Sequence, residues 1–196
     1  MSFGSRTGFG LEFHVERDSQ LLCVDVFLGG LHVNPWDNAF YPPLLVKKLK
    51  DELGRLRTPT VPPVLFTSPS AFFRLAESWM DDDAGAGLTP EAETALARCE
   101  FLDWGECTHQ VTALAFPEGD RVHLVCRVYE SGAAGGVEAP SEPTAVSVSR
   151  TAFTETLERG LAVAEREWSV RLAALRARGD LRDGGDMSGR PADGER

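Results

Sequence analysis

The feature of this sequence that most constrains its fold is a pair of alternating segments on either side of residues 117–120. Every second residue is apolar in both segments: Val111, Ala113 and Ala115 in the first, and Val122, Leu124, Cys126 and Val128 in the second. A two-residue alternation is typical of a strand with one buried face. We predict an antiparallel hairpin in which Phe116 pairs with Arg121 and Ala113 lies opposite Leu124. One face of this hairpin is then wholly apolar, so another element must cover it.

A second hairpin is predicted near the amino terminus, because residues 10–28 show the same alternation. The apolar positions are Leu11, Phe13 and Val15 in one strand and Leu22, Val24, Val26 and Leu28 in the other. A turn at residues 18–19 places Phe13 opposite Val24. The glycines at residues 29–30 tolerate the positive φ angles of a tight turn into a short third strand at residues 31–33. The first part of the chain is therefore predicted to form a meander.

Four segments are predicted to be helical from their apolar spacing and their first residues. They span residues 43–53, 68–80, 89–99 and 153–175. The last is the clearest, since apolar residues recur at three- and four-residue steps and charged residues occupy the other side. The helix around Phe72 carries an apolar load too dense for an exposed element, so we expect it to be buried or to form an interface.

Together these elements predict one α+β domain over residues 8–178. We expect a mostly antiparallel sheet of about five or six strands, covered on one face by the helices at residues 43–53 and 153–175. Residues 1–7 are predicted to be a flexible amino terminus. Residues 179–196 have few apolar side chains and are rich in glycine and charge. We therefore predict that they form a disordered tail.

The composition is that of a soluble globular protein with an acidic surface. Of the 196 residues, 42% are hydrophobic and 26% are charged, and the formal net charge is −10. An acidic surface repels nucleic acid and anionic membrane, so neither is expected as a partner, and a basic protein is the natural complement. No apolar run reaches the roughly 18 residues of a membrane-spanning helix and no secretory signal is recognisable, so we predict a cytoplasmic protein. The cysteines, Cys23, Cys99, Cys107 and Cys126, form no CxxC pair, and we expect reduced, packed thiols.

One group of residues points to chemistry. The predicted pairing brings Glu12, His14, Asp25 and His32 to the polar face of the amino-terminal meander. These side chains could ligate a divalent metal, or a histidine oriented by a carboxylate could act as a general base. Solvated strand faces commonly carry such residues without a site. The cluster therefore supports an alternative function, a metal-dependent or acid-base enzyme.

Two segments that combine aromatic and acidic residues are the best candidates for a protein-binding surface. They contribute Trp36, Asp37, Asn38 and Tyr41 from the first segment and Asp103, Trp104 and Glu106 from the second. Amphipathic aromatic side chains flanked by acids suit a protein interface. The same aromatic residues could instead pack the following elements onto the core, and the sequence leaves this choice open. Acidic stretches at residues 81–83 and 100–106 also suit a basic partner.

The order of elements, together with two short motifs, resembles a known family. Residues 37–42, DNAFYP, run into an amphipathic helix, and residues 104–108, WGECT, open a hairpin that precedes a long carboxyl-terminal helix. This arrangement resembles the small immunity proteins of bacterial polymorphic-toxin and contact-dependent inhibition systems. The resemblance implies a non-enzymatic α+β protein that binds and blocks a cognate toxin in the cytoplasm. The proline-rich connector at residues 57–63, the helix around Phe72 and the tail at residues 179–196 depart from that pattern, which leaves an unrelated α+β family as the alternative.

Binding is favoured over catalysis, because the sequence contains no recognisable catalytic signature. The leading hypothesis is a non-enzymatic protein that binds another protein, with a basic toxin domain as the suspected partner and without a cofactor. The metal-dependent or acid-base enzyme built on Glu12, His14, Asp25 and His32 remains the rival hypothesis.

Overall fold

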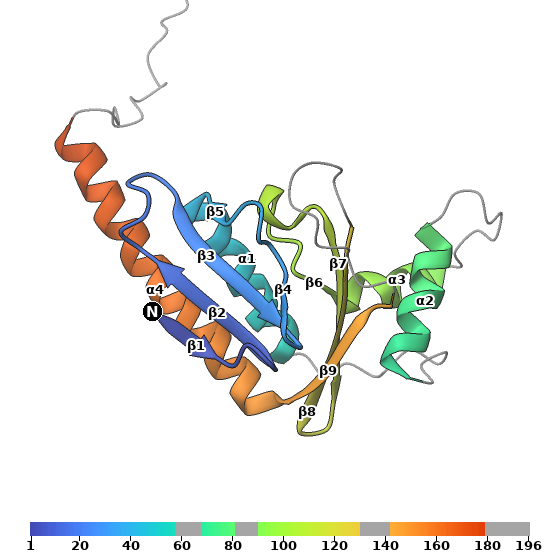
Figure 1. The fold of residues 1–196 in the computed structure, drawn as a ribbon. Helices are drawn as coiled ribbons and strands as arrows, with labels where there is room; N and C mark the ends of the chain where they lie inside the picture. Colours follow the sequence, from blue (N-terminus) through green and yellow to red (C-terminus); the bar gives the residue numbers. More distant parts are fainter. Residues whose placement is uncertain (58–67, 81–89, 130–141, 179–196) are drawn as a thin grey trace, which may run out of the picture.

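A computed structural model gives the chain an α+β fold with antiparallel sheets, which confirms the predicted fold class (Figure 1). The structure describes residues 1–57, 68–80, 90–129 and 142–178. The strands fall into two sheets instead of the single sheet that we expected. The predicted disordered tail, the acidic stretch at residues 81–83 and most of the proline-rich connector lie outside the described residues.

The first sheet is the amino-terminal meander with two additions. It consists of β1 (Ser2–Gly4), β2 (Phe9–His14), β3 (Leu22–Leu28), β4 (Leu31–His32) and β5 (Ala39–Phe40). Of the two additions, β1 comes from residues 1–7, the segment that the sequence predicted to be flexible. The strands are ordered β1-β2-β3-β4, and β5 also pairs with β3. Phe13 lies opposite Val24, as predicted. Gly29 and Gly30 have φ angles of 59° and 90°, so this turn does use the left-handed region that glycine tolerates.

The second sheet contains the central hairpin. Its strands are β6 (Glu100–Phe101), β7 (Val111–Glu118), β8 (Arg121–Val128) and β9 (Thr144–Ser149), ordered β6-β7-β8-β9. The predicted register is wrong by two residues, because Phe116 pairs with His123 and Glu118 pairs with Arg121. The strands continue further than expected into a two-residue turn, in which Gly119 has a φ angle of 58°. A shift of two residues leaves every side chain on its predicted face.

Two helices cover the inner face of the first sheet. These helices, α1 (Pro42–Arg57) and α4 (Arg150–Ala177), pack side by side, and α4 contacts β1 and β2 (Figure 1). The hydroxyl of Ser149 accepts a hydrogen bond from the N–H of Ala152 and caps the start of α4. Toward the other end of α4, Arg171 donates hydrogen bonds to the carbonyls of Val15 and Asp18 and so holds the β2–β3 turn against this helix. No helix in the described ranges is both long and apolar enough to cross a membrane.

The two sheets share one hydrophobic core. Phe9 of β2, Phe101 of β6 and Phe153 of α4 form an aromatic group with ring centroids 4.9 to 5.5 Å apart. All three rings are buried. Because each ring comes from a different layer, this group joins the first sheet, the second sheet and the long helix into one packed unit.

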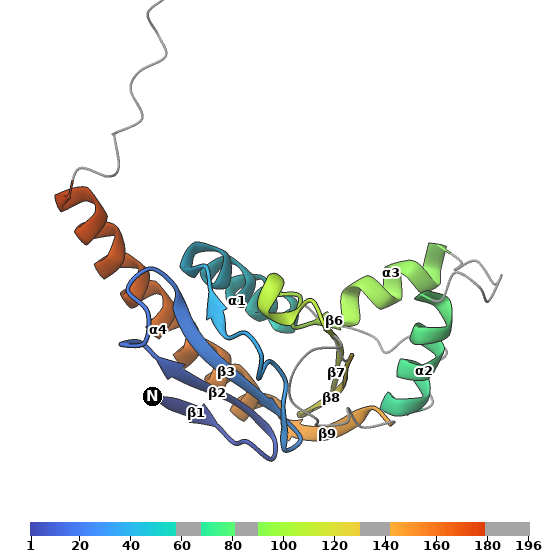
Figure 2. The same ribbon diagram turned by 45° about the horizontal axis from the view of Figure 1, so that its top comes forward.

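A smaller core lies on the other side of the second sheet. The helices α2 (Pro69–Met80) and α3 (Pro90–Cys99) cover this face (Figure 2). Phe72 and Phe73 of α2 pack there against Leu114, Phe116 and Val125 of the hairpin. The dense apolar face around Phe72 is therefore core, and the second sheet is buried on both sides.

Candidate protein-binding surface and polar cluster

The loop that connects β4 to α1, residues 33–41, is held along the edge of β3. Its backbone bonds to β3 at two points, since Val33 donates to Val26 at 2.8 Å and Val24 donates to Asn38 at 2.7 Å. On either side of these two bonds, β3 pairs over two residues with β4 and over two residues with β5. The loop is therefore ordered by the sheet, although its composition alone is that of a turn.

Asn34 fills the gap in this edge and was not singled out from the sequence. Its side-chain oxygen accepts a hydrogen bond from the N–H of Val26, and its amide donates to the carbonyl of Val24 and to that of Asp37. The residue is fully buried. The sequence shows only that Asn34 lies between a predicted strand and a proline. Its burial depends on the edge of β3, which the sequence does not place beside it.

The loop presents two aromatic side chains to solvent. Trp36 is 42% exposed and Tyr41 is 59% exposed. The Tyr41 ring makes an edge contact with Trp168 of α4, with centroids 6.3 Å apart. Asp37 is also exposed, whereas Asn38 is half-buried and holds the loop to the sheet by donating to Asp25. Three of the four predicted residues in this segment thus face outward.

The second predicted segment divides differently. Asp103 and Glu106 are exposed, but Trp104 is only 1% exposed. The indole N–H of Trp104 donates to the buried carboxylate of Glu52 at 3.3 Å, and its ring packs against Phe40. The prediction that Trp104 contacts a partner is therefore corrected, because α1 covers this side chain.

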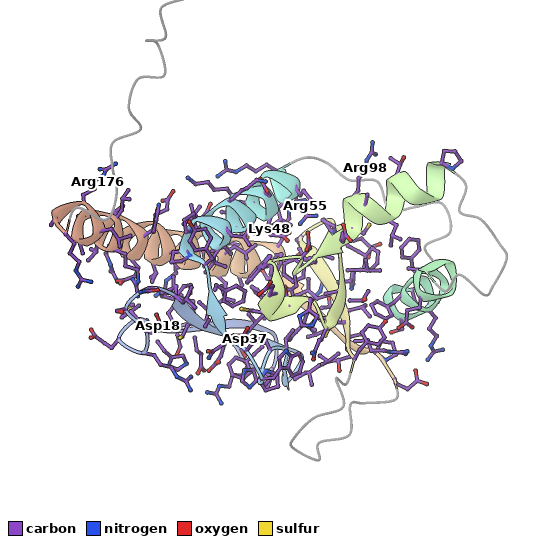
Figure 3. All side chains as sticks on the ribbon, turned by 90° about the horizontal axis from the view of Figure 1, so that it is seen from above. Asp18, Asp37, Lys48, Arg55, Arg98 and Arg176 are labelled. Atoms are coloured by element: carbon purple, nitrogen blue, oxygen red, sulfur yellow. The ribbon has the colours of Figure 1, made fainter. Side chains whose placement is uncertain are left out.

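The exposed parts of the two segments are neighbours on the surface. The short 3-10 helix η2 (Glu106–Thr108) lies against β5. The Cys107 thiol of η2 donates a hydrogen bond to the carboxylate of Asp37, which is labelled in Figure 3. Asp103 forms an ion pair with Lys48 of α1 at 2.5 Å. We refer to Trp36, Asp37, Tyr41, Asp103 and Glu106 as the loop surface.

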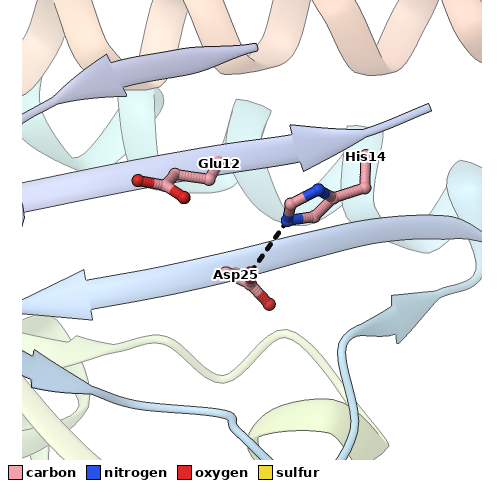
Figure 4. Close-up of side chains that lie close together, drawn as sticks. All are labelled: Glu12, His14 and Asp25. Atoms are coloured by element: carbon pink, nitrogen blue, oxygen red, sulfur yellow. Dashed lines mark hydrogen bonds and ion pairs between the residues drawn. The ribbon is translucent and has the colours of Figure 1, made fainter. Parts of the chain in front are cut away.

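The predicted polar cluster does form on the outer face of the first sheet (Figure 4). His14 Nε2 lies 2.8 Å from Asp25 Oδ2, and His32 Nε2 lies 3.4 Å from Asp25 Oδ1. Glu12 is held instead by Arg6, with both contacts at 2.7 Å. The structure thus brings both histidines to one carboxylate, on the shared face that the register predicted.

The electrostatics of the cluster favour ionised carboxylates. Burial alone would raise the pKa of Asp25, but hydrogen bonds from Asn38 and His14 and the charge of His32 lower it below its ordinary value. The hydrogen bond from Arg6 lowers the pKa of Glu12 in the same way. Asp25 and Glu12 are therefore acceptors at neutral pH, suited to hold a cation or a protonated histidine.

The cysteines are free and buried, as predicted. Burial raises the pKa of Cys126 to about 12 and that of Cys99 to about 11. Burial and the nearby Asp37 carboxylate raise the pKa of Cys107 to about 12. These three thiols remain protonated at neutral pH, which makes them poor nucleophiles.

Comparison with known proteins gives one informative match. No family model matches the sequence, and no curated protein matches it. The crystal structure of CdiI from Burkholderia dolosa AUO158 is similar to this structure with a TM-score of 0.55 and 15% sequence identity. The match covers 83% of this chain and 99% of that chain. The chain therefore shares the fold of an immunity protein of a contact-dependent inhibition system, which confirms the resemblance seen in the sequence.

Proposed function

We propose that this chain is a non-enzymatic protein that binds and neutralises a cognate toxin in the cytoplasm. The observation that carries the proposal is the similarity to CdiI, which extends over 99% of that chain. The fold alone does not specify a function, so the loop surface and the charge must supply the rest of the argument.

The loop surface has the properties of a binding site. Trp36 and Tyr41 supply exposed aromatic area, and Asp37, Asp103 and Glu106 supply negative charge around it. Because Asn34 and Asn38 already fix the loop, binding does not have to order it, and less conformational entropy is lost. A preformed aromatic centre with a charged rim is the usual arrangement of an interface hot spot.

The net charge of −10 favours a basic partner. A toxin domain that acts on nucleic acid has a basic groove for phosphates, and carboxylates such as Asp37 and Glu106 would occupy that groove in place of phosphate. Long-range attraction would speed the encounter, and the buried aromatic side chains would slow dissociation. We therefore propose a basic toxin domain as the partner.

A co-expression experiment tests the proposal. The product of the gene next to this one is induced in a sensitive host with and without this chain, and survival and complex formation are measured. We expect survival only when this chain is present, and co-purification of the two proteins. Equal survival in both strains, with no complex, would refute the immunity function.

The acid-base enzyme is the second candidate, because His14 and Asp25 form the hydrogen-bonded pair that general base catalysis needs. Against it, the Glu12 carboxylate is occupied by Arg6, and Asp25 also accepts from Asn38. The variant His14→Gln separates the two functions, since it removes the base and leaves the loop surface in place. We expect full protection by this variant; loss of protection in a folded, toxin-binding variant would favour catalysis.

A further inference from the structure

The outer face of the first sheet carries ligand-type side chains that the proposed binding function does not use. Glu12 and His14 are two residues apart on β2 and point to the same side, and Asp25 of β3 is the register partner of Glu12. One ligand atom from each of the three residues lies within 4.8 Å of the others. Across the described segments of the chain, no second group of three such residues was found.

His32 of β4 is a fourth potential ligand that lies outside this group of three, next to Asp25. Its Nε2 atom is shielded from solvent, makes no hydrogen bond and lies 3.4 Å from Asp25 Oδ1. The ring is fixed by stacking on Phe27, with centroids 4.8 Å apart. A shielded polar atom without a hydrogen bond is costly, so a ligand that satisfies this nitrogen would be bound with a gain in free energy.

We propose that Glu12, His14, Asp25 and His32 form a binding site for one divalent transition-metal ion, Zn²⁺ in the first instance. Two imidazole nitrogens and two carboxylate oxygens are ligands that Zn²⁺ accepts. The ligand atoms of a tetrahedral zinc site are about 3.4 Å apart. His14 Nε2 lies 2.8 Å from one Asp25 oxygen and His32 Nε2 lies 3.4 Å from the other, so the carboxylate stands between the two imidazoles. Glu12 joins this centre once its carboxylate leaves Arg6.

Two neighbours act on this site in opposite directions. Arg6 holds both oxygens of Glu12 and must release them, which its 64% exposed side chain can do by turning into solvent. Its positive charge also repels a metal cation. Asn38 donates to Asp25 at 2.5 Å and keeps that carboxylate oriented toward the histidines. A bound ion therefore links β2, β3 and β4, and the hydrogen bond of Asn38 extends this link to the loop.

The test uses the full chain without a histidine tag, in a buffer with a non-chelating reductant. Isothermal titration with ZnCl₂ should show one ion per chain, together with a higher melting temperature. The variant His14→Gln keeps a hydrogen-bond donor toward Asp25 but is a poor zinc ligand, so its affinity should fall by more than about tenfold. The variant Arg6→Ala should bind Zn²⁺ more tightly than the natural chain, which a purely structural role of Arg6 does not predict.

His123→Gln is the matched control, since His123 forms an isolated pair with Glu118 at 2.9 Å on the second sheet. It should bind Zn²⁺ as the natural chain does. If His14→Gln fails to fold by circular dichroism, His32→Gln takes its place. Absence of Zn²⁺ binding by the natural chain, or equal affinity of the variants at positions 14 and 123, would overturn the proposal. The purified chain is tested alone, so either result leaves the toxin-neutralising function to be judged separately.

Discussion

The side-chain oxygen of Asn34 accepts a hydrogen bond from the backbone N–H of Val26 at 2.9 Å and so acts as a strand partner for β3. The variant Asn34→Ala should lower the free energy of unfolding by about 2–3 kcal/mol, because it leaves buried backbone groups of Val24 and Val26 without partners. Urea denaturation measures the change. Lys47→Ala, at an exposed residue of the helix that follows the loop, is the control and should change stability by less than about 0.5 kcal/mol. Equal effects would mean that Asn34 does not hold the loop.

A second prediction concerns the buried carboxylate of Glu52. Burial raises its pKa above the ordinary value of 4.5, despite the nearby Arg55 and the hydrogen bond from Trp104. Because folding raises the pKa of this carboxyl, the folded state holds its proton more tightly than the unfolded state does. The contribution of Glu52 to the free energy of unfolding therefore decreases as the pH rises above 4.5. Glu52→Gln should therefore gain stability relative to the natural chain between pH 4.5 and pH 7, and match it more closely at lower pH.

The measurement is the urea midpoint of both proteins across this pH range. Glu100→Gln is the control, because Glu100 is exposed and its substitution should give no such trend. Glu52→Ala should instead cost about 1–3 kcal/mol, since it leaves the buried indole N–H of Trp104 unpaired. A constant difference between Glu52→Gln and the natural chain at every pH would contradict the raised pKa.

Two helical glycines should respond in opposite ways to alanine. A Cβ at Gly160 of α4 would lie 2.8 Å from Leu11 Cδ1 in the core, whereas a Cβ at Gly54 of α1 would meet no atom within 4 Å. Gly54→Ala should stabilise the protein by about 0.5–1 kcal/mol through helix propensity alone. Gly160→Ala should destabilise it by about 1–2 kcal/mol, because overpacking exceeds that gain. Thermal unfolding of the two variants tests this, and stabilisation by both would show that α4 does not lie so close to β2.

The last prediction concerns the complex with the proposed toxin. Trp36→Ala should mainly speed dissociation, because it removes buried aromatic area, while Asp37→Asn should mainly slow association. Higher salt should slow association of the natural chain, since charges beyond a Debye length of about 8–10 Å are screened. Surface plasmon resonance separates the two rates. Val170→Ala, at a 61% exposed residue on α4, is the control and should leave both rates unchanged.

The amino-terminal sheet and its polar cluster followed from the sequence because alternation, a short turn and two glycines agreed. Phe13 pairs with Val24, as the register required, and His14 and His32 lie on the predicted shared face, where both approach Asp25. In the central hairpin the same reasoning predicted the faces but missed the register by two residues. Apolar alternation repeats every two residues, so it cannot distinguish such shifts, and the two-residue turn at Gly119 decides between them.

What the sequence by itself determined was thus the helices and the longer strands, with the face that each of these strands buries. It did not predict β1, which lies in a segment expected to be flexible, or the short strands β5 and β6. Only the tertiary structure decided how the strands divide between two sheets, because both apolar faces of the second sheet needed a cover that distant helices supply. Only the tertiary structure also decided which tryptophan is buried, because Trp36 and Trp104 both lie among acidic and aromatic residues in the sequence. Trp36 remains exposed on the loop, whereas Trp104 is covered by α1 and bonded to Glu52, since burial depends on what packs above a residue and not on its neighbours in the chain.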